Sequence, residues 1–568
     1  MNVTLVGDGP AADAVRAALA DTDAAVHDGS ADDLADSTLG VVVAPVGSGA
    51  FARADRAADR WLAVEGGGVG GAPAAVDATV TLFDAVRFAD LRTRVASHPD
   101  GTSERDAGTT SDDAAPSARR FAGAVAGRLA VDALGGEAAD GRLVEVSGTA
   151  TRERRVLPTP DGPPERAPRK TAAGIDAETA ATRAERAVDD RVGLVAGVGE
   201  EASYPAPYYV ARLCDTGAFA DATAPRLAAG VAEGWDKAYT KAVGEALERY
   251  AAGAYRESWL DRAPERERLD AVSLSRFVRP DGWRDPDPDE PILWVAGERL
   301  TDGARVSLPG EAVLHPPPAE RHLPAITTGL GVWTDGVGAL RAGLAEAVER
   351  DATTVAWYST FEPLGLSVET EAFDRLARRA RSEGLEVTPL LVTVDVDVPV
   401  VACAVHREDE WPRFAVGSAA DLDGEAAATA ALCEAIQNWT ELERMGPERS
   451  AEAGGAIGEY AAFPEAAREF VDPATTAAAA DVGATDPPTG TEALRTLVER
   501  VADAGLEPYA TRLTPPDLAE LGFEAVRVVV PEAQPLFTGE PFFGARANEV
   551  PRELGYEPRL DRAYHPYP

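Results

Sequence analysis

The sequence predicts a mixed α/β (α+β) protein in which a small Rossmann-like N-terminal domain precedes a much larger α/β region. Three observations favour this fold class. The chain opens with short apolar strands around a Gly-containing turn and an Ala-rich helix, a rhythm typical of β-α-β units. Helical and strand patterns alternate from about residue 172 onward. The 568 residues also exceed a single small domain, since about 150 residues per domain is typical.

The first elements form a β-α-β pattern. We expect a strand over 3–6, a helix over 11–20, a second strand ending near Val26 and a third over 39–45. The turn Gly7-Asp8-Gly9 fits G-x-G-x-x-A, and Asp28 follows where a ribose-binding acid would fall. One such match has little specificity. A tight structural turn without a nucleotide is the favoured interpretation, and a nucleotide site is the alternative.

The remaining organisation follows from composition. Residues 99–120 lack apolar periodicity and indicate a flexible excursion. Residues 158–173 are dense in Pro and charge, so we predict domains at 1–165 and 172–568. We further expect a helix over 121–134, a strand over 142–146, a surface loop over 473–491 and a strand over 525–530.

The charge balance excludes some partners. The net charge of -40, from 95 acidic and 55 basic residues, argues against general binding to nucleic acid or anionic membranes. Lysine occurs only at positions 170, 237 and 241. A Lys-poor, acidic surface suits a cytoplasm at molar salt, where charge repulsion is screened, and we predict an extreme halophile as the source. GC-rich codon bias is the alternative, but it explains only the preference for Arg over Lys.

Cysteine and histidine place limits on metal chemistry and location. Three cysteines and six histidines are dispersed without a C-x-x-C pair, so we expect neither a disulfide framework nor a zinc site. Any metal should be a hard cation held by carboxylates. The N-terminus lacks a basic signal-peptide region and no run reaches 18 apolar residues, which predicts a cytoplasmic protein.

A short internal repeat is the most informative feature of the sequence. Residues 243–249 (VGEALER) are matched 101 positions later by residues 344–350 (LAEAVER). Both contain E-x-x-E-R, which on a helix places the two Glu on one face and Arg beside the first. A third apolar helix repeats the i, i+3 spacing. The candidate residues are Glu245, Glu248, Arg249, Glu346, Glu349, Arg350, Glu434 and Gln437.

Two interpretations of this repeat stay open. Each copy could be a solvated face with salt bridges that contribute a few tenths of a kcal/mol. The apolar neighbours argue instead for helices that pack inward, where unpaired carboxylates are costly. Lys237 and Lys241 lie just before the first copy and provide point charges suited to phosphate. Converging carboxylates with Arg and Lys suit Mg²⁺ and a nucleotide, although no Walker or kinase motif occurs.

These residues resemble the motifs of the YcaO family. Residues 234–249 resemble its first nucleotide-binding motif, residues 327–331 with 343–352 its second, and residues 431–437 a later helix. Residues 528–537 and the final Pro-Tyr-Pro resemble its C-terminal end. The resemblance covers about 172–568. Three motifs in the order and at the approximate spacing of the family identify it much more specifically than any single motif would.

The resemblance implies ATP-dependent modification of peptide backbone amides through phosphorylation of the amide oxygen. A neighbouring Cys, Ser or Thr side chain would give an azoline by cyclodehydration, whereas external sulfide would give a thioamide. A non-catalytic, ATP-binding accessory or peptide-binding protein is a further alternative. By matching position, Glu245, Glu248, Glu346 and Glu349 would hold Mg²⁺ and the triphosphate. The other nucleotide-binding positions are Lys237, Lys241, Arg249, Arg350, Glu434 and Gln437.

Other regions of the resemblance carry their own expectations. Pro568 corresponds to a proline-rich tail that helps arrange the active site, so it is the candidate catalytic position. Gly338 falls where many members have a further Glu. The N-terminal domain resembles the E1-like partner that recruits a leader peptide. The expected partners are a ribosomal peptide or protein substrate, a sulfur-donating or leader-binding protein and a second copy in a homodimer, with neither nucleic acid nor membrane.

Overall fold

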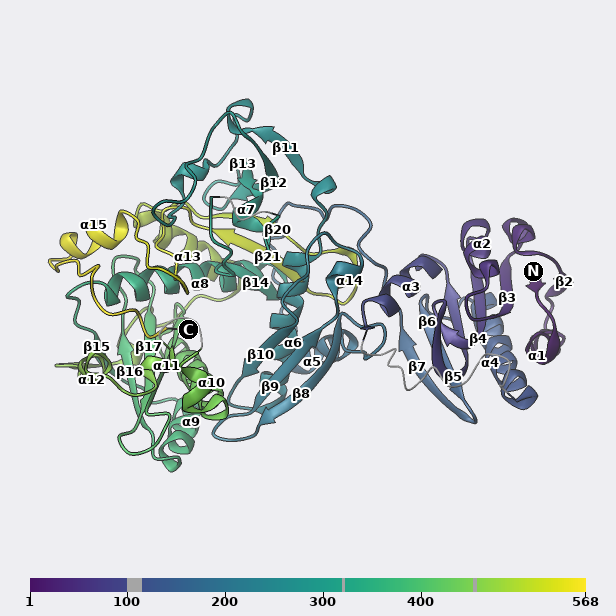
Figure 1. Ribbon diagram of the computed structural model, residues 1–568, viewed down its shortest axis with the longest axis horizontal. Helices are drawn as coiled ribbons and strands as arrows, with labels where there is room; N and C mark the ends of the chain where they lie inside the picture. The colour runs from purple at the N-terminus through teal and green to yellow at the C-terminus, as the bar shows by residue number, and fades with distance from the viewer. Residues whose placement is uncertain (100–114, 319–321, 453–456, 568) are drawn as a thin grey trace. The chain divides into compact units, whose positions relative to one another are not determined.

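The structure is a computed structural model that describes residues 1–99, 115–318, 322–452 and 457–567. It confirms the predicted fold class, because helices alternate with strands that gather into several sheets (Figure 1). The chain divides into two compact units. The first unit comprises Met1–Asp161, Arg186–Gly197 and Cys214–Phe219, and the second comprises Gly162–Glu185, Val198–Leu213 and Ala220–Pro568.

The first unit is built on a seven-stranded sheet with the order β2-β1-β3-β4-β5-β6-β7 (Figure 1). The first four strands of the chain pair in parallel and the later three pair antiparallel. The strands are β1 (Asn2–Val6), β2 (Ala25–Asp28), β3 (Leu39–Pro45), β4 (Trp61–Val69), β5 (Ala72–Phe83), β6 (Arg142–Ser147) and β7 (Ala150–Arg155).

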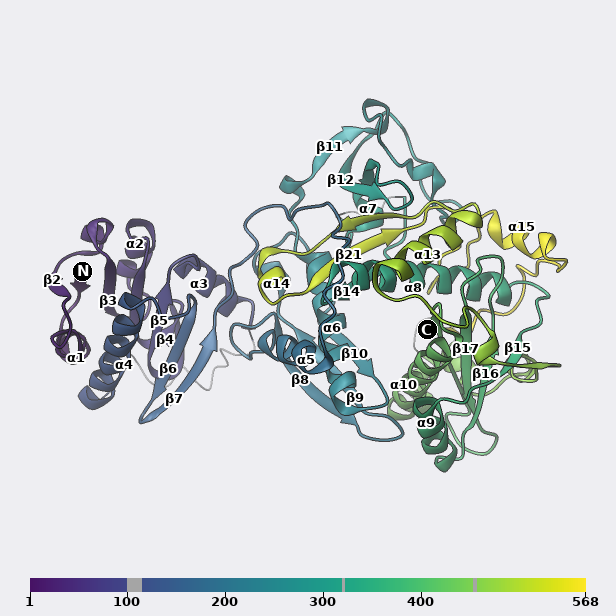
Figure 2. The same ribbon diagram turned by 180° about the vertical axis from the view of Figure 1, so that it is seen from behind.

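Helices cover both faces of this sheet. The helices α1 (Gly9–Leu19) and α4 (Pro116–Leu134) pack side by side and form one apolar core with the sheet (Figure 2). On the other face, α2 (Gly49–Ala57) and α3 (Phe88–Ala96) enclose a second core around the buried Trp61 ring. Helix α4 begins at Pro116, so the end of the predicted excursion is helical, because proline is favoured in a first helical turn. The rest of that excursion, 100–114, lies outside the described residues.

The turn after β1 is held by its backbone geometry. Gly7 has a φ of +109°, and a Cβ atom there would approach the carbonyl oxygen of Val43 to 2.2 Å. Only glycine fits such a position. Asp28, the candidate ribose-binding acid, accepts a hydrogen bond from Arg16 Nη2 at 2.6 Å. The carboxylate is therefore engaged in an ion pair within this unit.

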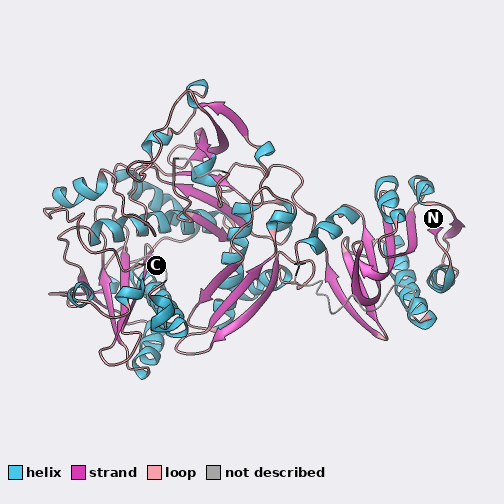
Figure 3. Cartoon of the chain, in the orientation of Figure 1, coloured by secondary structure: helices cyan, strands magenta, loops and turns pink. Residues whose placement is uncertain are grey.

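The second unit contains three further sheets among its described residues (Figure 3). Their strand orders are β10-β9-β8, then β11-β12-β20-β21-β14 with β13 paired to β12, and β18-β17-β16-β15-β19. The strands are β8 (Val195–Ala202), β9 (Tyr208–Leu213), β10 (Leu227–Val231), β11 (Asp261–Pro264), β12 (Pro291–Arg299), β13 (Arg305–Pro309), β14 (Leu330–Trp333), β15 (Leu364–Ser367), β16 (Glu386–Leu391), β17 (Val400–His406), β18 (Phe414–Ala420), β19 (Thr476–Ala478), β20 (Tyr509–Arg512) and β21 (Glu524–Val529).

Three long helices of this unit each pack on a different sheet. Helix α6 packs on β9 and β10, α8 on β14 and β21, and α10 on β17 and β18. The approach of α10 is close, because a Cβ atom at Gly417 in β18 would come within 2.4 Å of the Ala435 nitrogen. The helices are α5 (Ala177–Arg186), α6 (Trp235–Gly253), α7 (Gly310–Val313), α8 (Gly336–Trp357), α9 (Glu371–Ser382), α10 (Gly424–Ser450), α11 (Ile457–Tyr460), α12 (Glu465–Phe470), α13 (Gly490–Asp503), α14 (Pro516–Glu520) and α15 (Arg546–Glu553).

Two expectations about this unit meet different outcomes. The predicted strand over 525–530 is confirmed as β21 within one residue at each end. The predicted loop over 473–491 is wrong in part, because it contains β19, which pairs in parallel with β15. A three-residue strand has too little periodicity to be visible in the sequence. No helix in the described part of the chain has the length and apolar character needed to cross a bilayer.

Candidate nucleotide and metal site

The three long helices carry the predicted site residues. Helix α6 holds Glu245, Glu248 and Arg249, α8 holds Glu346, Glu349 and Arg350, and α10 holds Glu434 and Gln437. One side chain shows that the helices converge. Burial opposes the charge of the Arg350 guanidinium, but carboxylates from all three helices favour it and raise its pKa above the ordinary value. The structure therefore brings together carboxylates as distant in the chain as Glu245 and Glu434.

The first motif contains one paired and one unpaired carboxylate. Arg249 Nη2 donates to Glu245 Oε1 at 2.5 Å, the i, i+4 pair that helix geometry predicts. Glu248 has no such partner in its own motif. Burial raises the pKa of Glu248 well above its usual range, and the carboxylates of Glu346 and Glu245 raise it further. Like charges held this close favour binding of a cation.

The second motif leaves its arginine incompletely paired. The nitrogens of Arg350 lie 3.8 Å from Glu346 Oε1, 3.6 Å from Glu349 Oε1 and 4.0 Å from Glu434 Oε1. None of these separations is a hydrogen bond. Arg350 Nη1 is also buried without a hydrogen-bond partner. A buried guanidinium with unused donors is suited to accept an anion such as phosphate.

Ser418 in β18 fixes the carboxylates opposite Arg350. Its hydroxyl donates to Glu349 Oε1 at 2.6 Å, and its backbone N–H donates to Glu434 Oε2 at 2.9 Å. The Glu349 side chain is buried, with 8% of the residue exposed. Burial and the Glu434 charge raise the pKa of Glu349 to about 8, against the opposing charge of Arg350. Sequence reasoning missed Ser418, because a lone serine in a strand gives no signal.

Arg527 in β21 is a second residue that sequence reasoning missed. Its Nη atoms donate to the carbonyls of Thr327 and Ile326 at 2.8 and 2.9 Å. Burial lowers the pKa of Arg527 to about 10, although the charges of Glu346 and Glu248 act in the opposite direction. The sequence did contain a signal, since Arg527 is the one charge inside the apolar run of residues 525–530. A lone charge in a buried strand requires a partner.

Glu346 receives a backbone donor from the loop before α8. The N–H of Gly329 donates to Glu346 Oε2 at 2.9 Å. Burial raises the pKa of Glu346, while Arg350, the Gly329 N–H and Arg527 favour its charged form. Asp335 caps the start of the same helix by accepting the N–H of Gly338 at 2.7 Å. The loop and the cap together fix the rotation of α8 and the direction of its carboxylates.

The predicted lysines and Gln437 have neighbours other than the glutamates and arginines of the two E-x-x-E-R motifs. Lys237 Nζ donates to Glu233 at 2.9 Å, one turn earlier in the chain, and both Lys237 and Lys241 are exposed. Their charges reach the Cys433 thiol of α10 and oppose the rise of its pKa, which burial brings to about 11. Gln437 donates to Glu441 rather than to a carboxylate of the predicted site. These three residues therefore lie at the margin of the cluster.

The C-terminal tail reaches the second motif. Pro568, the predicted catalytic position, lies outside the described residues. Tyr567 beside it is 4% exposed, and its hydroxyl is buried without a hydrogen-bond partner. Burial raises the pKa of Tyr567, and the charge of Glu349 raises it further while Arg350 opposes this. The tail is held by hydrogen bonds from Trp357 Nε1 to the Ala563 carbonyl and from Tyr460 to the Tyr564 carbonyl.

The position of the missing glutamate is filled by an aromatic ring. A Cβ atom at Gly338 would come within 2.1 Å of the Trp333 indole. The indole itself is 55% exposed. A side chain at position 338 would displace this ring, and Gly338 supplies no carboxylate to the site.

The donor chemistry fits Mg²⁺ and a nucleotide. In the described part of the chain, no group of three or more His, Cys, Asp or Glu side chains is arranged to hold a metal alone. Mg²⁺ is usually held by one or two carboxylates together with substrate phosphates, so a complete protein cage is not required. The carboxylates of the two motifs supply hard oxygen ligands, and Arg350 Nη1 supplies a buried donor without an acceptor. The residues present therefore match the group that the motifs imply.

Comparison with protein families identifies the relationship. The family model described as YcaO cyclodehydratase, ATP- and Mg²⁺-binding, matches residues 229–534, more than half of the chain. The protein belongs to the YcaO family. This YcaO protein is accordingly an enzyme of a family that uses ATP and Mg²⁺, and the matched range contains all three helices of the site.

Solved structures of similar fold support the architecture of this YcaO protein. A heterocyclase in complex with substrate and cofactor aligns with a TM-score of 0.72 at 19% identity, covering 99% of this chain and 84% of that one. The heterocyclase TruD aligns with a TM-score of 0.64 at 17% identity, covering 100% and 84%. At these identities the likeness concerns the fold. The search of curated proteins found no match.

Proposed function

We propose that this YcaO protein is an ATP-dependent cyclodehydratase that converts Cys, Ser or Thr residues of a ribosomal peptide into azolines. One observation carries the proposal: Arg350, with a buried unpaired donor, faces carboxylates from three helices inside the range matched by the family. In this reaction the side-chain nucleophile attacks the preceding amide carbon, and the amide oxygen accepts the terminal phosphoryl group of ATP. The peptide loses one water overall, while ATP becomes ADP and phosphate.

The residues of the site have separate parts in this proposal. Glu245, Glu248, Glu346 and Glu349 would hold Mg²⁺, which when bound neutralises phosphate charge. Arg350 would donate to phosphate oxygens, because its Nη1 has no hydrogen-bond partner within the protein. Ser418 is a positioning residue, since it fixes the direction of the Glu349 carboxylate. Arg249 orients Glu245 through their hydrogen bond.

The raised pKa of Glu349 affects the binding of a cation to the site. With a pKa of about 8, the carboxyl group is largely protonated at neutral pH before a cation arrives. A cation must displace this proton, so binding of Mg²⁺ releases it. The buried hydroxyl of Tyr567 lies in the field of the same carboxylate. We infer that the tail closes this side of the site against water.

The N-terminal unit has a proposed part in substrate recruitment. Its parallel strands β1 to β4 and the helices on both faces form a Rossmann-like core. The resemblance to an E1-like partner supports binding of a leader peptide by this unit. A sulfur-donating or leader-binding second protein, a homodimer, a cytoplasmic location and a halophilic source remain predictions.

Peptide-dependent release of phosphate tests the proposed function. The purified protein in molar KCl is mixed with Mg-ATP and with peptides that contain Cys, Ser or Thr. Released phosphate is measured, and the masses of the peptide products are determined by mass spectrometry. Cyclodehydration gives peptides that have lost one water. Replacement of oxygen by sulfur, seen only when sulfide is added, would show thioamidation instead. Saturable binding of ATP with no peptide-dependent phosphate release would favour the accessory-protein alternative.

A further inference from the structure

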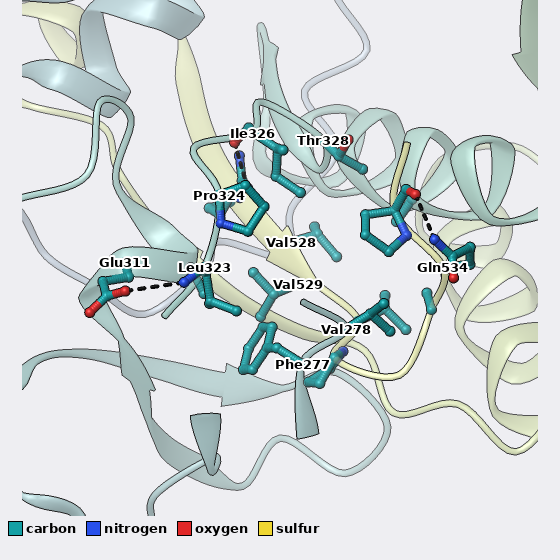
Figure 4. A pocket seen from close by; sticks show the side chains of 17 residues that line it. Phe277, Val278, Glu311, Leu323, Pro324, Ile326, Thr328, Val528, Val529 and Gln534 are labelled. Atoms are coloured by element: carbon teal, nitrogen blue, oxygen red, sulfur yellow. Dashed lines mark hydrogen bonds between the residues drawn. The ribbon is translucent and has the colours of Figure 1, made fainter. Parts of the chain in front are cut away.

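The second unit contains a pocket with many apolar lining residues (Figure 4). Its lining includes Phe277, Val278, Leu323, Ile326 and Val528, which come from three separate segments of the second unit. In Figure 4 these side chains surround a common space. We call this space the β21 pocket, because consecutive residues of β21 and of the segment after it form its floor.

The β21 pocket shares its walls with the nucleotide and metal site. Ala347 lines the pocket and directly follows Glu346 in α8. Thr328 lines it and directly precedes Gly329, whose N–H is hydrogen-bonded to Glu346. Arg527 also lines it, and its charge acts on Glu346 and on Glu248. Residues that adjoin or interact with Glu346 therefore form part of the pocket wall.

The polar groups around the pocket are largely engaged within the protein. Glu311 accepts hydrogen bonds from the N–H groups of His322 and Leu323 and from His322 Nδ1. The Gln534 amide donates to the carbonyls of Pro535 and Phe542, and accepts the N–H of Gly544. The Nη atoms of Arg527 are bonded to backbone carbonyls, which leaves only its Nε without an acceptor.

This combination selects one class of ligand. A nucleobase binds through hydrogen bonds along its edge, and a pocket whose polar groups are already engaged offers few of them. An aliphatic or aromatic side chain needs only apolar contact. We propose that the β21 pocket receives an apolar side chain of the peptide substrate, adjacent to the amide that is modified. This rests on the proposed function.

Binding of small amino-acid amides tests the pocket directly. The probe is N-acetyl-leucinamide, and saturation-transfer NMR follows its contact with the full chain in molar KCl. We expect binding of the leucine compound to exceed that of N-acetyl-aspartamide by about tenfold, because apolar burial favours the former. Saturating Mg-ATP should not displace the probe, since the nucleotide occupies the neighbouring site.

Two substitutions of the half-buried Ile326 report on the pocket itself. Ile326→Trp narrows the space and should weaken N-acetyl-leucinamide binding by about tenfold without changing the affinity for Mg-ATP. Ile326→Ala widens it and should shift the preference toward N-acetyl-tryptophanamide. The second variant keeps the test informative if the first one folds poorly. Glu499→Ala, at an exposed ion pair of α13, should leave amide binding intact, because Glu499 does not line the pocket.

Several results would overturn the proposal. Equal binding of the leucine and aspartate compounds, displacement of the probe by Mg-ATP, or no effect of either Ile326 substitution would each do so. Displacement by Mg-ATP would assign the pocket to the nucleotide instead. Failure of the proposed function looks different: the wild type would bind N-acetyl-leucinamide with the expected selectivity but would not bind Mg-ATP.

Discussion

The two copies of the E-x-x-E-R motif have the same spacing but different environments. In α6, Arg249 and Glu245 form a direct hydrogen bond at 2.5 Å. In α8, the corresponding arginine, Arg350, lies 3.8 Å from Glu346 and has a buried donor without a partner. The first copy therefore keeps one direct ion pair, although Arg249 Nε is also buried without a hydrogen-bond partner. The second copy has no direct hydrogen bond between its arginine and its own two glutamates.

The tertiary neighbours of each helix explain the difference. Glu434 from α10 lies 4.0 Å from Arg350 Nη2, and Ser418 from β18 donates a hydrogen bond to Glu349. The residue that follows, Asp351, is 1% exposed and is held by Arg546 at 2.6 Å. This buried ion pair anchors α8 at the residue that follows Arg350. Identical spacing along a helix thus sets which side chains share a face, and the packing sets what they can bind.

The largest effect is expected when a carboxylate of the second copy is removed. Glu346→Ala should abolish saturable binding of Mg-ATP, because it removes a ligand and leaves Arg350 beside one carboxylate fewer. Glu245→Ala should do the same for the first copy. Calorimetric titration in molar KCl measures the affinity, and thermal unfolding checks that the fold is retained.

The matched control is an exposed glutamate at the same helical spacing from its arginine partner. Glu499 in α13 pairs with Arg495 at 2.6 Å on the surface, so Glu499→Ala should leave the affinity unchanged. If Mg-ATP still bound normally after both Glu346→Ala and Glu245→Ala, the assignment of the site would be wrong.

Substitution of the arginines by lysine should have different effects on Mg-ATP binding in the two copies of the motif. Arg350→Lys should weaken Mg-ATP binding roughly 30-fold, because a lysine cannot replace a planar donor set worth about 2 kcal/mol. Arg249→Lys should cost about threefold or less, since a point charge can keep the pair with Glu245. Equal losses in the two variants would contradict the distinction between the copies.

The pH dependence of binding should also come from the second copy. Below pH 8 the Glu349 carboxyl group is mostly protonated, and the bound cation needs its ionised form. Affinity should therefore rise about tenfold from pH 6.5 to 7.5 and level off above the pKa. Titrations in buffers of different ionisation enthalpy would detect the released proton. Glu349→Gln should remove that part of the pH dependence, and an unchanged profile would refute its origin in Glu349.

The smallest expected effect concerns the tail beside the second copy. Tyr567→Phe removes a buried hydroxyl that has no partner, so the free energy of unfolding should stay the same or increase by about 1 kcal/mol. Peptide-dependent phosphate release should nevertheless fall several-fold if the hydroxyl helps to close the site. Loss of stability together with activity would indicate a purely structural contact.

Much of the fold could be predicted because it depends on local patterns. The strand over 39–45 and the strand around 525–530 were visible as apolar runs, and both are confirmed as β3 and β21. The helices of the three motifs were visible from Ala-rich periodicity. The short strand β19 was not, because its three residues are defined by pairing with β15 rather than by their own pattern.

The candidate site was predictable where chemistry repeats along the chain. The repeated glutamates and arginines stood out because such groups are costly to bury without a function. Ser418 and Tyr567 did not, since neither residue type is unusual in a strand or a tail. Their importance comes from which carboxylate they meet, and that contact joins segments 69 and more residues apart.

The sequence by itself determined the fold class, the acidic surface and the two faces that carry E-x-x-E-R, because composition and helical spacing are local properties. Only the tertiary structure decided that these faces meet and that an apolar pocket contains Ala347, the residue after Glu346. It also decided that Arg249 bonds directly to Glu245, whereas Arg350 bonds directly to neither glutamate of its motif. The physical reason is that burial and charge coupling depend on neighbours from distant segments. The shared E-x-x-E-R pattern therefore has different hydrogen-bond partners in α6 and α8.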